Sequence, residues 1–172
     1  MIDERFGDAE QALLNALLPK VEQLVGDHYR LTSFGPIHRC YEVVTLEAAD
    51  HTGRCETALA KLCRFDRLER AIGPERVSHF YRVYLQDDNL LARAREPGAS
   101  LRALLLYVLT HELVHIVRFE SFQVPFGAAQ ALRGKEERAV HALTLELIGA
   151  LREQEVDRLA KVLARQTVDI VE

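Results

Sequence analysis

The sequence contains no uninterrupted run of 18 apolar residues, which is the length that marks a membrane-spanning helix. Its acidic N-terminus does not have the positive-then-apolar form of a signal peptide. Its three cysteines, Cys40, Cys55 and Cys63, include no Cys-x-x-Cys pair. An odd number of dispersed thiols suits a reducing compartment better than a disulfide framework. These absences predict a cytoplasmic protein with no membrane partner, whose cysteines pack in its core.

The chain also has no excess of basic residues over acidic ones. Lys and Arg number 22 against 26 Asp and Glu, so the formal net charge is −4. Acidic residues interleave with the arginines, and no long basic run forms. Because nucleic-acid-binding domains are usually basic, we expect no nucleic-acid partner.

The chain has no internal repeat, low-complexity tract or linker that would divide it. With 172 residues and 48% hydrophobic content, it can bury one sizeable core. We therefore expect a single domain over residues 1–172. Its first part, 1–99, holds an N-terminal helix and the strands, and its second part, 100–172, is helical.

Local patterns predict an α+β fold. Apolar residues at helical spacing predict helices at residues 3–25, 100–119, 136–151 and 153–170. β-branched and aromatic residues predict strands at residues 39–46, 54–65 and 78–85, although 58–62 suits a helix equally. Pro19 predicts a kink or a second piece in the first helix. A turn at 50–53 predicts a hairpin between the first two strands, a second turn falls at 73–74, and residues 87–89 end the third strand.

Residues 111–115 read His-Glu-Leu-Val-His inside the apolar helix 100–119. Residues four apart lie on one face of a helix, so His111 and His115 can bind one tetrahedral Zn²⁺. Glu112 lies about 100° around the helix, where its carboxylate can reach a metal-bound water as a general base. Random order would produce this pattern in about 3% of such chains. The alternative is a helix whose histidines make ordinary hydrogen bonds and whose glutamate faces water.

A catalytic zinc takes three protein ligands, so one must come from elsewhere in the chain. The extended pattern HExxHxxGxxH is not met, because Arg118 stands at the glycine position and Ser121 at the third histidine position. Glu136 and Glu137 open the next predicted helix and are the candidates. Acidic residues in a first helical turn also interact favourably with the helix dipole without binding anything.

Residues 100–145 resemble the gluzincin class of zinc metallopeptidases, in which a glutamate from a following helix completes an HExxH site. The resemblance implies a small zincin-like domain, with a short, mostly antiparallel sheet packed on the HExxH helix and on C-terminal helices. It also implies Zn²⁺ as cofactor, Glu137 as the third metal ligand and Glu112 as the catalytic base. The class tends to place an acidic residue four positions after the ligand, where this chain has His141. His141 is therefore an outer partner, a catalytic donor to the reacting carbonyl, or, like Glu136, a rival ligand.

The resemblance also suggests where a substrate binds. The strand ahead of the metal helix, at 80–85, would be an edge that pairs with an extended peptide, unless it is an internal strand. Tyr81, Tyr84 and Arg118 are weak candidates for contacting the substrate or its oxyanion. Phe122, Val124 and Phe126 make the loop 121–130 apolar, as in a pocket lining or a partner surface.

The sequence thus predicts a zinc metallopeptidase that acts on a peptide or protein substrate. The main alternative is a non-catalytic zinc protein, in which four protein ligands close a structural site or the zincin scaffold is a binding module. A di-iron bundle would need a second ExxH unit, which the chain lacks. A metal-free scaffold that binds a partner through the apolar loop is a weaker alternative. The apolar stripe of helix 153–170 either packs on the core or forms an oligomer contact, so a homo-oligomer is one of the alternatives.

Overall fold

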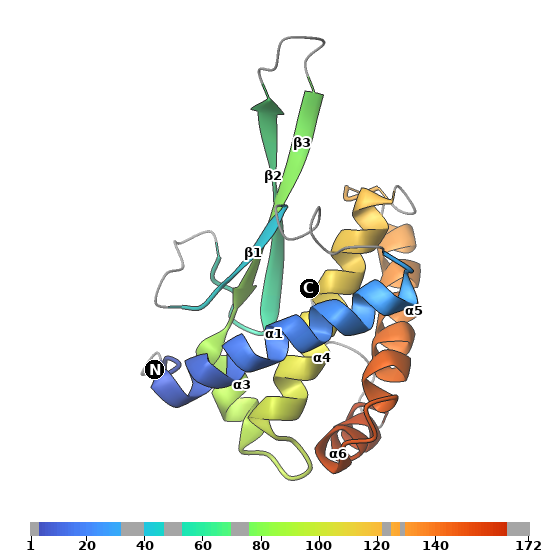
Figure 1. Ribbon diagram of the computed structural model, residues 1–172. Coiled ribbons are helices and arrows are strands. Elements are labelled where there is room, and N and C mark those ends of the chain that lie inside the picture. Colours follow the sequence, from blue (N-terminus) through green and yellow to red (C-terminus); the bar gives the residue numbers. More distant parts are fainter. Residues whose placement is uncertain are drawn as a thin grey trace.

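The computed structural model describes residues 4–31, 40–46, 53–69, 76–121, 125–127 and 130–164. These residues form an α+β fold, which confirms the predicted class (Figure 1). Its helices are α1 (Asp8–His28), α3 (Asp87–Ala94), α4 (Leu101–Glu120), α5 (Gln130–Gly149) and α6 (Gln154–Leu163). Its strands are β1 (Tyr41–Val44), β2 (Ala60–Glu69) and β3 (Arg76–Leu85). None of the described helices is long and apolar enough to cross a membrane.

The sheet is mixed and has the strand order β1-β3-β2. β3 pairs antiparallel with β2 along its whole length, from Ala60 opposite Leu85 to Glu69 opposite Arg76. β1 pairs parallel with β3 over the shorter stretch from Tyr41 to Val44. The sheet is therefore mostly antiparallel, as predicted. Figure 1 shows the end of β2 and the start of β3 projecting beyond the helices.

Two expectations about the strands are wrong. The first two strands do not form a hairpin, because β3 lies between them. Of the two alternatives for residues 80–85, the structure shows the internal strand where β1 pairs with β3. β2 also begins later than predicted. The preceding backbone instead bonds to side chains after β3: Gln86 accepts from Cys55 N at 2.9 Å, and Asn89 Nδ2 donates to Ala58 O at 2.6 Å. The predicted turns at 50–53 and 73–74 lie largely or wholly outside the described residues.

Helix α1 runs without interruption through Pro19, so the predicted second piece is wrong. Proline removes one hydrogen bond from a helix interior, which usually weakens it. Here the apolar face continues on both sides of the proline and is buried at Leu14, Leu17, Val21 and Val25. Burial of that face stabilises the helix more than the lost hydrogen bond weakens it.

Helix α3 begins where the sequence analysis expected only the end of a strand. The buried carboxylate of Asp87 accepts hydrogen bonds from Phe6 N at 3.0 Å and Leu46 N at 3.2 Å. Asp87 and Asp88 lie in the first turn, where acidic side chains interact favourably with the helix dipole. The acidic pair at the end of the predicted strand was therefore also a signal for the start of a helix.

Helix α4 is the centre of the fold. Ser100 caps it by accepting from Ala103 N at 3.2 Å, and every residue from 103 to 117 is buried. The helix contacts α1, α3, α5 and α6, and Figure 1 shows α4 and α5 side by side. α5 starts at Gln130, earlier than predicted. The last residues of the predicted helix 153–170 lie outside the described part of the chain.

Candidate metal centre

One face of α4 carries the predicted histidines within a stripe of rings. Tyr107, His111, His115 and Phe119 follow one another at intervals of four residues, so they lie on one side of the helix. Neighbouring rings are in contact, with His111 and His115 4.8 Å apart between centroids and His115 stacked on Phe119 at 5.5 Å. The stripe faces α5, which brings up Glu137 and, one turn later, His141.

Donor atoms of three residues converge between the two helices. His111 Nε2 lies 3.1 Å from His115 Nε2 and 3.2 Å from Glu137 Oε2. His115 Nε2 lies 3.1 Å from the other oxygen of Glu137, Oε1. Four ligands that stand about 2.0–2.1 Å from a tetrahedral zinc lie about 3.3 Å from one another. The spacing of the donors therefore fits a zinc ion, and these three residues form a group that could hold a metal ion among the described residues.

Several buried polar atoms at this site have no hydrogen-bond partner among the described residues. They include Nδ1 of His111, Nδ1 of His115 and Oε1 of Glu112. Leaving a buried polar atom unpaired costs about 1–3 kcal/mol. Glu112 is only 1% exposed, so the alternative in which it faces water is wrong. The arrangement is not that of an ordinary core held by satisfied hydrogen bonds.

The electrostatics favour the metal-binding protonation states for two of the three residues. Burial lowers the pKa of His111 to about 4, so its imidazole is neutral at pH 7. Burial alone would raise the pKa of Glu137, but hydrogen bonds from His111 and His115 outweigh it and hold this pKa at about 2. Burial also opposes charge on His115, but the neighbouring carboxylates, Glu137 foremost, raise its pKa overall. Metal binding would therefore compete with protonation of His115.

Glu112 has the properties of a proton acceptor. Burial raises the pKa of its carboxyl group to about 7, and this pKa is also sensitive to the charges of His115 and Glu137. A group that titrates near neutral pH can both accept and return a proton under physiological conditions. The sequence placed Glu112 beside the metal face, and the structure shows it there, in a fully buried position.

Glu136 is not part of the three-residue cluster and pairs with Arg118 instead. It is 6% exposed and binds Arg118 through both oxygens, with Arg118 Nε at 2.5 Å and Nη2 at 2.8 Å. α5 begins one and a half turns earlier than predicted, so Glu136 and Glu137 do not lie in its first turn. The first-turn interpretation of this pair is therefore wrong. The guanidinium of Arg118, a predicted substrate contact, is held against Glu136.

His141 lies next to the cluster but outside the three-residue group. Its Nδ1 is 2.7 Å from the hydroxyl oxygen of Tyr107, and the ring of Tyr107 also contacts that of His111. Tyr107 was not among the predicted site residues, because it lies within an apolar run of the sequence. Its position four residues before His111 was the available signal, since that spacing places it on the metal face.

No protein-family model, curated protein or solved structure matches the chain. The gluzincin resemblance therefore rests on the sequence of residues 100–145 alone.

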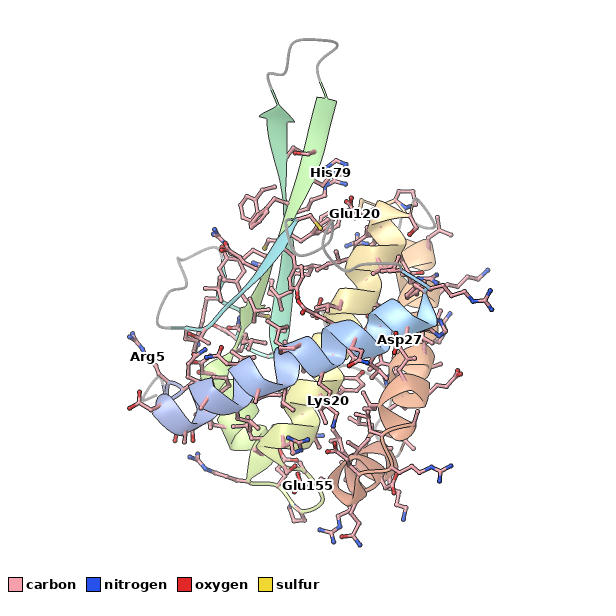
Figure 2. The ribbon with its side chains drawn as sticks, in the orientation of Figure 1. Arg5, Lys20, Asp27, His79, Glu120 and Glu155 are labelled. Atoms are coloured by element: carbon pink, nitrogen blue, oxygen red, sulfur yellow. The ribbon has the colours of Figure 1, made fainter. Side chains whose placement is uncertain are left out.

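The two predicted tyrosines on β3 lie in different places. The Tyr81 hydroxyl donates to Glu120 Oε1 at 2.9 Å, and its ring stacks on Phe119, which in turn stacks on His115. Figure 2 shows Glu120 at the end of α4 that lies beside the sheet. Positions 81 and 84 point to opposite faces of the strand. Tyr84 accordingly accepts from Arg82 at 3.0 Å and packs against Gly53, away from the cluster.

One residue of the predicted apolar loop packs beside this aromatic group. The Phe126 ring contacts those of Phe119, at 5.1 Å, and Tyr81, at 6.2 Å, and Arg64 lies over it at 4.8 Å. Phe122 and Val124 lie outside the described residues. An aromatic cluster therefore extends from His115 toward the sheet.

Proposed function

We propose that this chain is a zinc-dependent hydrolase that cleaves peptide bonds. The observation that carries the proposal is the convergence of His111, His115 and Glu137 at zinc-like spacing, with Glu112 buried alongside. Three protein ligands leave one coordination position for water, which is the arrangement of catalytic zinc sites. The peptide substrate is what the gluzincin resemblance implies.

Each residue then has a defined task. Bound zinc supplies Lewis acidity toward the scissile carbonyl and makes water acidic enough to lose a proton near pH 7. Glu112 accepts that proton and returns it to the leaving amine. His141 donates a hydrogen bond to the carbonyl oxygen as negative charge develops on it. When Tyr107 donates to Nδ1 of His141, the imidazole proton stays on Nε2, where it is available to the substrate.

We also propose the cytoplasm as the compartment. An odd number of dispersed cysteines with no Cys-x-x-Cys pair suits a reducing compartment better than a disulfide framework.

Replacement of Glu112 by Gln tests the catalytic role separately from metal binding. The variant should bind about one zinc per chain, as the unaltered protein should, because Glu112 is not in the ligand group. Its peptide-cleaving activity should fall at least about 100-fold, since proton transfer by a positioned carboxylate contributes 10²–10⁴-fold. Metal content by mass spectrometry and turnover of a peptide library measure the two effects.

His115→Ala and Glu137→Ala provide the matched ligand variants, and both should lose zinc, whereas His141→Ala should keep it. Full activity in the Glu112→Gln variant would contradict the hydrolase proposal. Loss of zinc in all three variants, His141→Ala included, would instead indicate that His141 closes the site as a fourth ligand.

Burial of the site supports a second candidate, a non-catalytic zinc protein. Glu112 and His111 are each 1% exposed, and only Glu137 is partly open to solvent among the proposed ligands. A hydroxamate inhibitor binds zinc only where a coordination position is free. Retention of zinc together with no hydroxamate binding would favour the non-catalytic candidate.

A further inference from the structure

The two adjacent glutamates at residues 136 and 137 lie on opposite sides of one imidazole ring. Glu137 Oε1 is 3.1 Å from Nε2 of His115, whereas Glu136 Oε1 is 3.9 Å from its Nδ1. The side chains of His115 and Glu136 are each 6% exposed. The pair therefore meets in a region that excludes most solvent.

The Nδ1 atom of His115 needs an acceptor if Nε2 binds a metal. A neutral histidine that coordinates through Nε2 carries its proton on Nδ1. In metal sites this N–H almost always donates to a carboxylate, a carbonyl or water. Here Nδ1 is buried and makes no hydrogen bond within the described residues. The carboxylate of Glu136 lies just beyond hydrogen-bond range of it.

Arg118 holds that carboxylate in place. It lies three residues after His115, so both side chains share one side of α4. Its guanidinium donates to both oxygens of Glu136, in a two-point contact that sets the plane of the carboxylate. Each carboxylate oxygen has two lone pairs, so Oε1 can accept from Arg118 and from His115 together.

We propose that Glu136, positioned by Arg118, orients His115 for zinc by accepting the hydrogen bond from its Nδ1. Glu136 is thus a positioning residue that acts through His115, while its neighbour Glu137 is the ligand. The inference rests on the proposed zinc site and adds a role for two residues outside it. Such outer carboxylates fix the orientation of the imidazole and make it a stronger ligand.

The test is the zinc affinity of Glu136→Gln, measured by competition with a chelator. Because outer partners typically contribute 10–100-fold to metal affinity, we expect the variant to bind zinc about 10–100-fold more weakly. Arg118→Gln should weaken binding in the same direction. The double variant should bind little more weakly than Glu136→Gln alone, because both changes remove one arrangement. Glu146→Gln, an exposed glutamate on the same helix, is the matched control and should leave affinity unchanged.

A second measurement separates positioning from general stability. In the zinc-loaded protein, the His115 Nδ1–H proton should give an imidazole signal in ¹H–¹⁵N spectra, which His115→Ala removes. Glu136→Gln should move that signal or abolish it. Zinc affinity within twofold of the unaltered protein and an unmoved signal would overturn the inference. If Glu136→Gln does not fold, Glu136→Asp, which retracts the carboxylate by one methylene, provides the same comparison. Failure of the unaltered protein to bind zinc would instead overturn the proposed function.

Discussion

At the scale of single residues, identical side chains differ in role because their surroundings differ. Glu136 and Glu137 are adjacent in the sequence, yet one pairs with Arg118 and the other with two histidines. Glu112 is buried, and burial raises the pKa of its carboxyl group. A pattern of residue types does not distinguish these glutamates, because partners and burial depend on how the helices pack.

Tyr107→Phe tests the proposed control of His141. The change removes one hydroxyl and its hydrogen bond to Nδ1 of His141 while the ring is kept. We expect turnover to fall about tenfold, because loss of one hydrogen bond worth about 1.4 kcal/mol releases the tautomer of His141. Zinc affinity should not change, since neither residue is in the ligand group. Peptide turnover and chelator competition on the same preparation measure both, and Tyr84→Phe, away from the site, is the control. A fall in zinc affinity equal to the fall in turnover would show that Tyr107 supports the metal instead.

At the scale of elements, α4 and its partners determine where the site lies. α4 supplies His111, Glu112 and His115, and α5 supplies Glu137 from the facing side. Residues outside the site hold these helices to their neighbours. Glu153, just before α6, pairs with Arg102 of α4 at 3.0 Å and with Lys20 of α1 at 2.5 Å. Figure 2 shows Lys20 on α1. One carboxylate therefore links three helices.

This carboxylate predicts an acid-sensitive contribution to stability. Hydrogen bonds from Arg102, and then from Lys20, lower the pKa of Glu153 from 4.5 to about 2. A lowered folded-state pKa stabilises the protein above pH 4.5, and this contribution is lost as pH falls from 4.5 to about 2. Glu153→Gln should therefore be about 1–2 kcal/mol less stable at pH 7, after allowance for solvent screening. Urea unfolding of both proteins at pH 7 and at pH 2.5 measures the difference in their free energies of unfolding.

The difference in free energy of unfolding between Glu153→Gln and the unaltered protein should become smaller toward pH 2. At low pH the carboxyl group of Glu153 is increasingly protonated in the folded as well as in the unfolded state. Glu146→Gln serves as the exposed control and should track the unaltered protein at both pH values. A difference that stays constant with pH would mean that the charge of Glu153 does not contribute to stability.

At the scale of the whole molecule, the proposed zinc site connects two helices of one continuous core. Buried residues from Phe6 near the start of the chain to Leu163 at the end of α6 belong to a single cluster. A ligand that bridges α4 and α5 and binds only the folded state must stabilise that state. Metal binding and global unfolding should therefore be linked.

Zinc should raise the melting temperature, and a chelator should reverse the increase. Free zinc at 100 times its dissociation constant adds about 2.7 kcal/mol. For a chain of this length, that corresponds to about 5–10 °C in Tm. Scanning calorimetry with and without zinc measures the shift, and Glu137→Ala should abolish it. An equal shift in Glu137→Ala would place the responsible metal at another position.

The sequence by itself determined the local features of this protein. Helix periodicity is a property of the backbone, so the spacing of His111 and His115 was enough to place both on one face of α4 and Glu112 beside it. The same reasoning predicted the α+β class, and residue propensities predicted β3. Helix α3 was not predicted, because the same residue types are common in turns and at the starts of helices.

Only the tertiary structure decided which downstream residue faces the histidines. The resemblance favoured Glu137 as the third ligand but left Glu136 and His141 as rivals, and the packing of α5 against α4 placed the carboxylate of Glu137 beside both Nε2 atoms. Strand order was predicted wrongly, because the parallel pairing of β1 with β3 joins segments far apart in the chain. Such contacts depend on how helices and strands pack, and local residue patterns carry no information about the angle or order of that packing.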